Sequence, residues 1–222
     1  MATRQNTLKK QVAKAALEFI KPGMALGVGT GSTVNFFIDQ LENYRDQLTV
    51  VVASSRATEA RLRARGITVT ELDQAADLDL YVDGADEANK RFHLLKGGGG
   101  ALTREKVLAS ASRKFVCIID ESKWVATLGQ FPLPVEVVPM ARPYVARQFV
   151  KLRGQPVWRE NYTTDNGNII LDVHNLQIAS PPELETRLNQ IPGIVTVGLF
   201  ANRPADVILM ASDSGIKRLD RR

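Results

Sequence analysis

Glu105 is an acidic residue in an otherwise apolar helical stripe. Ala101, Leu102, Leu108 and Ala109 lie three or four positions away from it, which is the spacing of neighbours on one helix face. An ionised carboxylate is costly in apolar surroundings, so such a residue needs a reason to be there. A partly desolvated carboxylate suits abstraction of a proton next to a carbonyl group. The other interpretation is a glutamate at the edge of the stripe that reaches water.

Lys96 and a run of glycines, Gly97–Gly100, precede this helix. Consecutive glycines cost chain entropy unless the backbone takes unusual dihedral angles or approaches another group closely. The start of a helix offers N–H groups to an anion. Lys96 would place a positive charge where an oxyanion develops, although a solvated side chain is the simpler interpretation.

Two aspartates, Asp83 and Asp86, directly follow an apolar strand. Ligands of parallel sheets bind beyond the carboxyl ends of the strands, so both side chains can reach one site. Three interpretations stay open at this point. The aspartates are surface carboxylates of a turn, ligands of a hard metal ion, or acids and bases for proton transfer.

A glycine-rich loop, Gly27–Thr33, lies between a strand and a helix. Its glycines, its hydroxyl groups and the helix start suit a phosphate group. A dinucleotide loop would have a third glycine where Ser32 stands, and an acid in place of Ser54–Arg56. A nucleoside triphosphate loop would have a lysine after the glycines. A phosphate monoester is the remaining phosphate ligand, and the other interpretation is a plain strand-to-helix turn. The hydroxyl groups of Ser54, Ser55 and Thr58 at the end of the second strand favour phosphate binding.

The elements that must position these residues alternate between strands and helices. Apolar runs predict strands at residues 24–28, 50–53, 67–69, 78–82 and 115–119. Helical spacing predicts helices at residues 8–19, 36–41, 57–64 and 101–111. The alternation indicates an α/β fold, in which a Rossmann-like parallel sheet is covered on both faces.

The pattern changes after residue 131. Strands at residues 135–138, 156–159, 169–173 and 194–198, with helices at 143–152 and after Ser180, give the order β-α-β-β-α-β of a ferredoxin-like α+β unit. Residues 164–168 predict a turn, and Ser180–Glu183 a capping box. A last strand at residues 207–210 would rejoin the first sheet. We expect a catalytic domain at 1–128, completed by 204–222, and a smaller ferredoxin-like domain at 129–203.

Composition limits the classes of partner. The lone cysteine, Cys117, excludes an internal disulfide and a thiolate metal site, which favours a reducing cytoplasm. The first 21 residues lack the continuous apolar core of a signal peptide, and no apolar run is long enough to span a membrane. The net charge is +5, but the basic tail (Lys217, Arg218, Arg221 and Arg222) contains no aromatic residue for stacking on bases. We therefore expect neither nucleic-acid nor membrane binding.

Five segments together resemble the signature blocks of type A ribose-5-phosphate isomerases, in the same order along the chain. They are Gly27–Thr33, Tyr81–Glu87, Lys96–Lys106, Phe131–Val137 and Thr164–Asn168. The resemblance implies an enzyme without metal or cofactor, which interconverts ribose 5-phosphate and ribulose 5-phosphate in the non-oxidative pentose phosphate pathway. It also implies a homodimer or homotetramer, with residues 129–203 serving oligomerisation and covering the active site.

The same resemblance assigns roles to residues. Glu105 would move a proton between carbons 1 and 2, Asp83 and Asp86 would open the sugar ring, and Lys96 would steady the enediolate. The residues expected to bind substrate are Lys9, Thr30, Gly31, Ser32, Thr33, Gly84, Ala85, Gly97, Gly98, Gly99 and Lys123.

Three other functions compete with this one. A non-catalytic sugar-phosphate sensor would keep the phosphate loop without needing Glu105. A coenzyme A transferase would use the glutamate as a nucleophile, and an amino-sugar phosphate deaminase would be expected to have a catalytic histidine.

Overall fold

The computed structural model describes residues 2–75 and 77–221, with side chains from residue 4. Met1, Ala76 and Arg222, the last residue of the predicted basic tail, lie outside the described residues. The chain forms two units. The first comprises the chain as far as Gly84, Arg104–Trp124 and the chain from Ala205 onward, and the second comprises Ala85–Thr103 and Val125–Pro204.

The first unit is built on a mixed sheet with the strand order β13-β12-β6-β3-β1-β2. The strands are β1 (Met24–Val28), β2 (Leu48–Ala53), β3 (Leu78–Asp83), β6 (Ser112–Asp120), β12 (Val207–Ser212) and β13 (Gly215–Asp220). All neighbouring strands are parallel except β13, which pairs with β12 in an antiparallel hairpin. The sequence predicted the five parallel strands, including the return of residues 207–210 to this sheet, but not β13.

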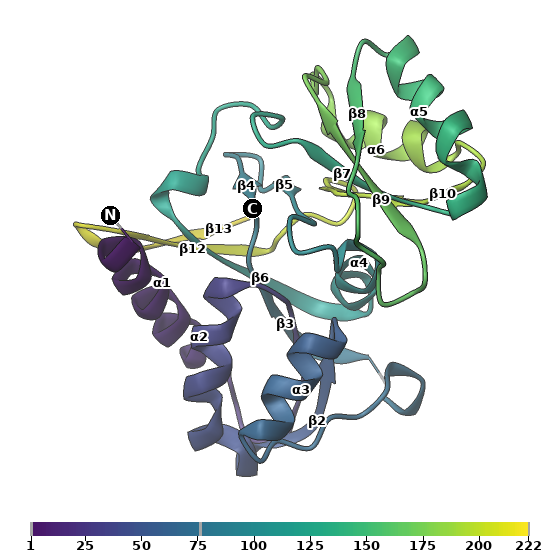
Figure 1. Cartoon of the computed structure of the whole chain (residues 1–222). Coiled ribbons are helices and arrows are strands. Elements are labelled where there is room, and N and C mark those ends of the chain that lie inside the picture. The colour runs from purple at the N-terminus through teal and green to yellow at the C-terminus, as the bar shows by residue number, and fades with distance from the viewer. Residues whose placement is uncertain (1, 76, 222) are drawn as a thin grey trace. The chain divides into compact units, whose positions relative to one another are not determined.

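The helices α1 (Ala2–Ala16), α2 (Ser32–Leu41) and α3 (Arg56–Ala64) cover one face of this sheet, and Figure 1 shows them side by side. Their buried side chains, such as Val12, Phe37 and Leu62, pack in one cluster with Leu26 and Val82 of the strands. A fourth helix, α4 (Leu102–Ser110), follows the glycine run. No helix in the described part of the chain has the length and apolar character needed to cross a membrane.

The strand predicted at residues 67–69 does not form. Ile67 is buried, but its N–H bonds to the Leu62 carbonyl and so closes the end of α3. The next bond, from Thr70 N–H to the Val51 oxygen at 2.8 Å, is a single contact with β2 and not a ladder. The apolar run therefore marks a buried loop, which hydrophobicity alone does not distinguish from a short strand.

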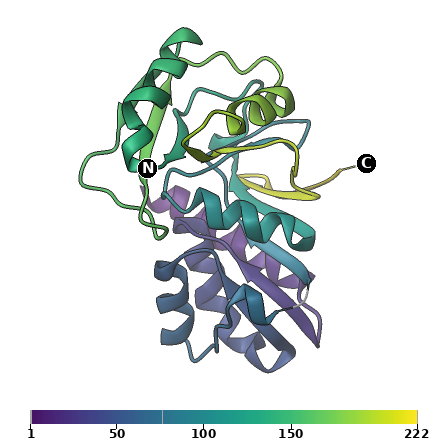
Figure 2. The same ribbon diagram turned by 90° about the vertical axis from the view of Figure 1, so that its right-hand side faces the viewer.

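The second unit contains the predicted β-α-β-β-α-β order. Its elements are β7 (Leu133–Val137), α5 (Arg142–Lys151), β8 (Gln155–Trp158), β9 (Ile169–His174), α6 (Pro181–Asn189) and β10 (Ile194–Val197). The strands form an antiparallel sheet in the order β10-β7-β9-β8. Helices α5 (green in Figure 2) and α6 (yellow-green) pack with Phe149 and Leu188 against Val135 and Leu171 of the sheet.

The capping box predicted at the start of α6 does not form as expected. Ser180 is the N-cap residue, but its side chain makes no capping hydrogen bond. Pro181 and Pro182 occupy the first helical positions and have no N–H to offer. The Ser180 carbonyl instead accepts the Leu184 N–H at 3.0 Å, which starts the helix through the backbone.

A small three-stranded sheet ties residues 85–103 to the second unit. It has the order β11-β5-β4, formed by β4 (Glu87–Ala88), β5 (Leu94–Leu95) and β11 (Leu199–Phe200). The Lys96 N–H continues the pairing by bonding the Gly198 carbonyl at 2.8 Å. The sequence placed these residues in the domain at 1–128, since two-residue strands leave no pattern that predicts them.

The buried carboxylate of Glu87 stabilises the second unit through hydrogen bonds to the backbone. Its side chain is 3% exposed and accepts the N–H groups of Gly129 and Phe131, each at 2.6 Å. Hydrogen bonds to a charged group contribute roughly 1.5–3 kcal/mol each. We expect Glu87→Ala to lower the free energy of unfolding by about 3 kcal/mol or more in urea titrations. Glu71→Ala, at an exposed position, should change it by less than about 0.5 kcal/mol. Equal effects of the two substitutions would contradict the prediction.

Candidate active site

Asp83, at the carboxyl end of β3, is fully buried, and both oxygens of its carboxylate accept hydrogen bonds. Its carboxylate accepts the N–H groups of Thr30 at 3.1 Å and Gly84 at 2.7 Å. The Tyr81 hydroxyl donates to its other oxygen. These donors hold the carboxylate in one orientation at the end of the strand, where ligands of such sheets bind.

The glycine-rich loop runs directly over this carboxylate. A Cβ atom on Gly29 would lie 2.0 Å from the Asp83 Cγ, so no other residue fits there without displacing the aspartate. Gly31 has a φ of +132°, which L-residues with side chains rarely adopt. Gly29 therefore allows a close approach of the backbone to Asp83, and Gly31 allows the turn; the approach to a ligand stays a prediction.

The hydroxyl groups predicted to accompany this loop bond to the loop itself. The Thr30 hydroxyl lies 2.7 Å from that of Ser54 and 2.8 Å from that of Ser55. The Thr58 hydroxyl donates to the Gly29 carbonyl at 2.7 Å. This polar cluster at the end of β2 fixes the shape of the loop, and the Thr30 side chain is part of it.

An anion-binding arrangement lies at the start of α2. Ser32 and Thr33 are the first residues of the helix, whose initial N–H groups lack partners within the helix. The Lys9 ammonium group, from α1, donates to the Ser32 hydroxyl at 3.0 Å. A cation, a hydroxyl and a helix start thus meet at one point, which is the chemistry that binds a phosphate.

Glu105 faces inward, as its place in the apolar stripe predicted. It lies in the first turn of α4 and is 3% exposed, and Leu102, Leu108 and Ala109 of the same stripe are buried. Its charge acts on Tyr81 of β3. The pKa of Tyr81 is raised well above its ordinary value, first by burial, then by the charge of Asp83 and then by that of Glu105. The charges of both carboxylates therefore oppose ionisation of one buried phenol.

Tyr81 received no role in the sequence analysis, although it stands in one of the five blocks. Residues two apart on a strand point to the same face, so Tyr81 and Asp83 had to share a face once the strand was predicted. The two-residue spacing on the strand would therefore have predicted the contact between Tyr81 and Asp83.

The second unit holds Asp86, Lys96 and the glycine run. The Asp86 carboxylate accepts the Gly98 N–H at 2.8 Å, and a Cβ atom on Gly98 would lie 2.7 Å from the Asp86 Oδ1. Lys96 is 2% exposed, with its ammonium 5.5 Å from the centre of the Phe200 ring. The interpretation of Lys96 as a solvated lysine is therefore wrong, and its charge is held inside the protein.

A buried glutamate that sequence reasoning gave no role, Glu136, links two more of the five blocks. Its carboxylate accepts the side chains of Thr164 at 2.8 Å, Asn166 at 3.1 Å and Asn168 at 2.8 Å, and also that of Thr103. On β7, Val135 and Val137 face the helices of the unit, so Pro134 and Glu136 face the other way. Thr103, three residues after the glycine run, is therefore bound at that opposite face of the sheet.

The structure groups the predicted residues in two sets. Lys9, Thr30, Gly31, Ser32, Thr33, Asp83, Gly84, Glu105 and Lys123 belong to the first unit, and Ala85, Asp86, Lys96, Gly97, Gly98 and Gly99 to the second. Lys123 ends a short turn that the Asp120 carboxylate caps by accepting the Ser122 N–H at 3.0 Å. Among the described side chains no cluster of three or more His, Cys, Asp or Glu could hold a metal ion. The metal-site interpretation of Asp83 and Asp86 therefore finds no third ligand of these types there.

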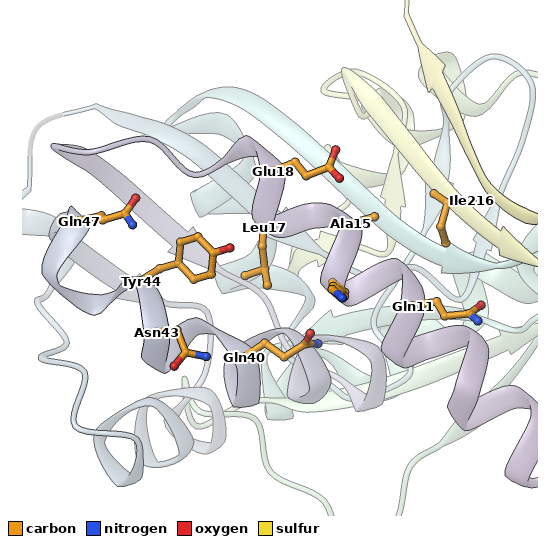
Figure 3. A pocket seen from close by; sticks show the side chains of 10 residues that line it. Gln11, Ala15, Leu17, Glu18, Gln40, Asn43, Tyr44, Gln47 and Ile216 are labelled. Atoms are coloured by element: carbon orange, nitrogen blue, oxygen red, sulfur yellow. The ribbon is translucent and has the colours of Figure 1, made fainter.

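A surface cavity of about 850 Å³ lies elsewhere in the first unit. Figure 3 shows its lining, which includes Gln11 and Leu17 of the amino-terminal segment, Tyr44 and Ile216. Gln40, near the end of α2, also lines it, whereas the anion-binding arrangement lies at the start of that helix. None of the predicted site residues is among the residues that line this cavity.

Comparison with known proteins gives matches along nearly the whole chain. Residues 50–215 match the model of the family ribose 5-phosphate isomerase A, also called phosphoriboisomerase A. The crystal structure of ribose 5 phosphate isomerase A from Neisseria gonorrhoeae is 44% identical, with 98% of each chain covered and a TM-score of 0.96. The enzyme from Methanocaldococcus jannaschii is 38% identical, with 96% of this chain and 98% of that chain covered and a TM-score of 0.92.

A third structure shows a related enzyme with a ligand. It is a D-ribose-5-phosphate isomerase in complex with phospho-erythronic acid, 35% identical, with 97% of this chain and 98% of that chain covered and a TM-score of 0.93. The shared α/β fold and the family match define an isomerase of sugar phosphates. More narrowly, the chain belongs to the ribose 5-phosphate isomerase A family.

The raised pKa of Tyr81 can be measured by alkaline titration of tyrosine absorbance near 295 nm. Because burial and two negative charges oppose ionisation, Tyr81 should stay protonated near pH 10, where exposed phenols titrate. Tyr81→Phe should therefore leave the absorbance change of the folded protein near pH 10 unchanged. Tyr144→Phe, at a residue 41% exposed, should remove about a third of it, since Tyr81 is one of the 4 tyrosines of the chain and the other three titrate there.

The same shift affects stability at high pH. The unfolded chain releases the Tyr81 proton at about pH 10 and the folded chain only at higher pH, so the free energy of unfolding should fall as the pH rises above about 10. This fall should be smaller in Tyr81→Phe. A loss of absorbance change in Tyr81→Phe equal to that in Tyr144→Phe would show that Tyr81 ionises normally.

Proposed function

We propose that this chain interconverts D-ribose 5-phosphate and D-ribulose 5-phosphate through an enediolate, with Glu105 as the base. The observation that carries the assignment is the burial of Glu105 in the first turn of α4, with its charge acting on Tyr81 beside Asp83. The family and its enzymes support the reaction itself. A non-catalytic sensor is not favoured, since the chain matches isomerases along nearly its whole length.

The reaction moves one proton between adjacent carbons. Glu105 removes the proton from carbon 2 of the opened aldose and returns it to carbon 1, while a second proton moves between the oxygens. A single carboxylate can serve both carbons because they are neighbours in the planar enediolate. General acid–base catalysis of this kind contributes typically 10²–10⁴-fold. Burial keeps bulk water from competing for the carboxylate.

The phosphate group of the substrate is assigned to the start of α2. The Lys9–Ser32 pair and the first N–H groups of the helix support this position, with Thr30, Gly31 and Thr33 completing the loop. The phosphate does not react. Its binding energy is therefore available to orient the carbons that do.

The remaining steps are assigned to the aspartates and Lys96. We propose that Asp83 and Asp86 open the furanose ring and carry hydroxyl protons, and that Lys96 stabilises the enediolate oxyanion. Gly84, Ala85, Gly97, Gly98, Gly99 and Lys123 are proposed to contact the substrate. Only two residues of the chain separate the two aspartates, which supports their action on one molecule.

The ligand of one relative supports this chemistry. Phospho-erythronic acid combines a phosphate with a carboxylate, and the D-ribose-5-phosphate isomerase in that complex is 35% identical to this chain. A carboxylate carries two oxygens and a negative charge in one plane, as an enediolate does. A site that binds this acid therefore suits the intermediate that we propose.

Assembly and location belong to the proposal and rest on the family resemblance. We propose a homodimer or homotetramer in the cytoplasm, in which residues 129–203 serve oligomerisation and cover the active site. The lone cysteine, Cys117, is buried in β6, which is compatible with a reducing compartment.

Glu105→Gln tests the base. The substitution keeps the shape of the side chain and removes its ability to accept a proton, so kcat should fall by about 10²–10⁴-fold with the fold retained. Ketose formation from ribose 5-phosphate in the presence of a chelator measures it, and solvent hydrogen should enter carbon 1 of the ketose during wild-type turnover. Glu71→Gln, at an exposed site, is the control. No wild-type turnover would refute the isomerase, and an undiminished Glu105→Gln rate would refute only the base.

Lys9→Met tests the phosphate position, and the adjacent Lys10 provides a matched control. Lys9 bonds Ser32, whereas Lys10 lies over the Phe36 ring at 5.5 Å. Lys9→Met should raise KM for ribose 5-phosphate about tenfold or more, in line with the roughly 1.5–3 kcal/mol of a charged hydrogen bond. Lys10→Met should leave KM within about twofold. Similar KM values for the two variants would place the phosphate elsewhere.

A further inference from the structure

Two side chains of the ferredoxin-like sheet bind the backbone of the glycine run. The Arg159 guanidinium donates to the carbonyl oxygens of Gly98 at 3.1 Å and Gly97 at 3.4 Å. The Tyr162 hydroxyl donates to the carbonyl oxygen of Gly99 at 3.1 Å. Three successive carbonyl groups therefore bond to side chains from one segment, which follows β8.

The guanidinium is itself held in place from β9. Arg159 bonds Asp172 through Nε at 2.8 Å and through Nη2 at 2.6 Å, and both side chains are about four-fifths buried. This two-bond pair fixes the plane of the guanidinium, and its Nη1 then reaches the glycine carbonyls. A lysine has no planar fork and would not make both sets of bonds at once.

The orientation of these carbonyls determines where the neighbouring N–H groups point. In a trans peptide, the C=O of one residue and the N–H of the next point in opposite directions. The carbonyls of Gly97 and Gly98 both point to Arg159, so the N–H groups of Gly98 and Gly99 point away from it. The Gly98 N–H donates to the Asp86 carboxylate at 2.8 Å, on the side opposite the guanidinium.

From this arrangement we propose that Arg159, oriented by Asp172, is a positioning residue for Asp86. It orients two peptide groups of the glycine run. The Gly98 N–H then binds the Asp86 carboxylate, and the Gly99 N–H points to the same side. The inference rests on the proposed function, because it matters for turnover only if Asp86 takes part in the reaction. Arg159 acts through the backbone and touches no reacting atom.

The first test separates catalysis from binding. Arg159→Met should lower kcat for ribose 5-phosphate by on the order of 10–100-fold, the loss expected when a reacting group is misplaced by about 1 Å. KM should change by less than about threefold, because the proposed phosphate site lies at Lys9 and Ser32. Arg142→Met is the matched control, since that arginine stacks on Trp158 at 4.2 Å and is not among the donors to the glycine carbonyls. It should keep the wild-type kcat.

The second test asks whether Arg159 acts through Asp86. If it does, Arg159→Met should cost little further activity in an Asp86→Asn background, because the group that it positions no longer functions. Independent losses that multiply in the double variant would overturn the proposal. So would a wild-type kcat in Arg159→Met, or a rise in KM alone.

Asp172→Asn keeps the proposal testable if Arg159→Met does not fold. It weakens the hold on the guanidinium without removing it, so kcat should fall less than in Arg159→Met, and again not in the Asp86→Asn background. An unchanged kcat in folded Asp172→Asn would overturn the role given to Asp172. Absence of turnover in the wild type would instead refute the proposed function, so the two failures are distinguishable.

Discussion

In the first unit, the predicted site residues depend on one close approach, that of the Gly29 backbone to the Asp83 carboxylate. Because no Cβ fits at position 29, the chain can pass directly over the end of β3 and bring the Thr30 N–H to the aspartate. The loop then enters α2 in the direction that sets the helix start beside Lys9. The helix start that we propose for the phosphate and the oriented Asp83 carboxylate thus arise from the same turn.

The second unit uses the same device with a different scaffold. Asp86 is held against the Gly98 backbone, which again leaves no room for a side chain. Here the glycine run is supported by an antiparallel sheet. Successive residues of its strands face opposite sides of the sheet, so the two faces make different contacts. Val135 and Val137 of β7 pack on the helices, and Glu136 between them binds Thr103 at the start of α4. The strand that builds the core therefore also anchors the segment that carries the glycine run.

Local pattern predicted much of this protein. The five parallel strands, the ferredoxin-like order and the inward orientation of Glu105 all follow from short-range periodicity. The features that the pattern did not predict depend on contacts with residues distant in the sequence. Ile67 is buried without being in a strand, β13 alternates too few apolar residues to stand out, and the burial of Lys96 depends on Phe200, about a hundred residues away. The roles of Arg159 and Glu136 likewise follow only from three-dimensional contacts, although both are charged residues beside or within predicted strands.

The antiparallel hairpin at the end of the chain has a consequence for self-association. Five parallel strands alone would expose the hydrogen-bonding edge of β12, an apolar strand of the kind that recruits strands from other molecules. The hairpin covers that edge with β13, an exposed ribbon that carries Lys217 and Arg218. Charged edge strands oppose the addition of further strands. The β13 ribbon therefore opposes the edge-to-edge addition of foreign strands on this side of the sheet.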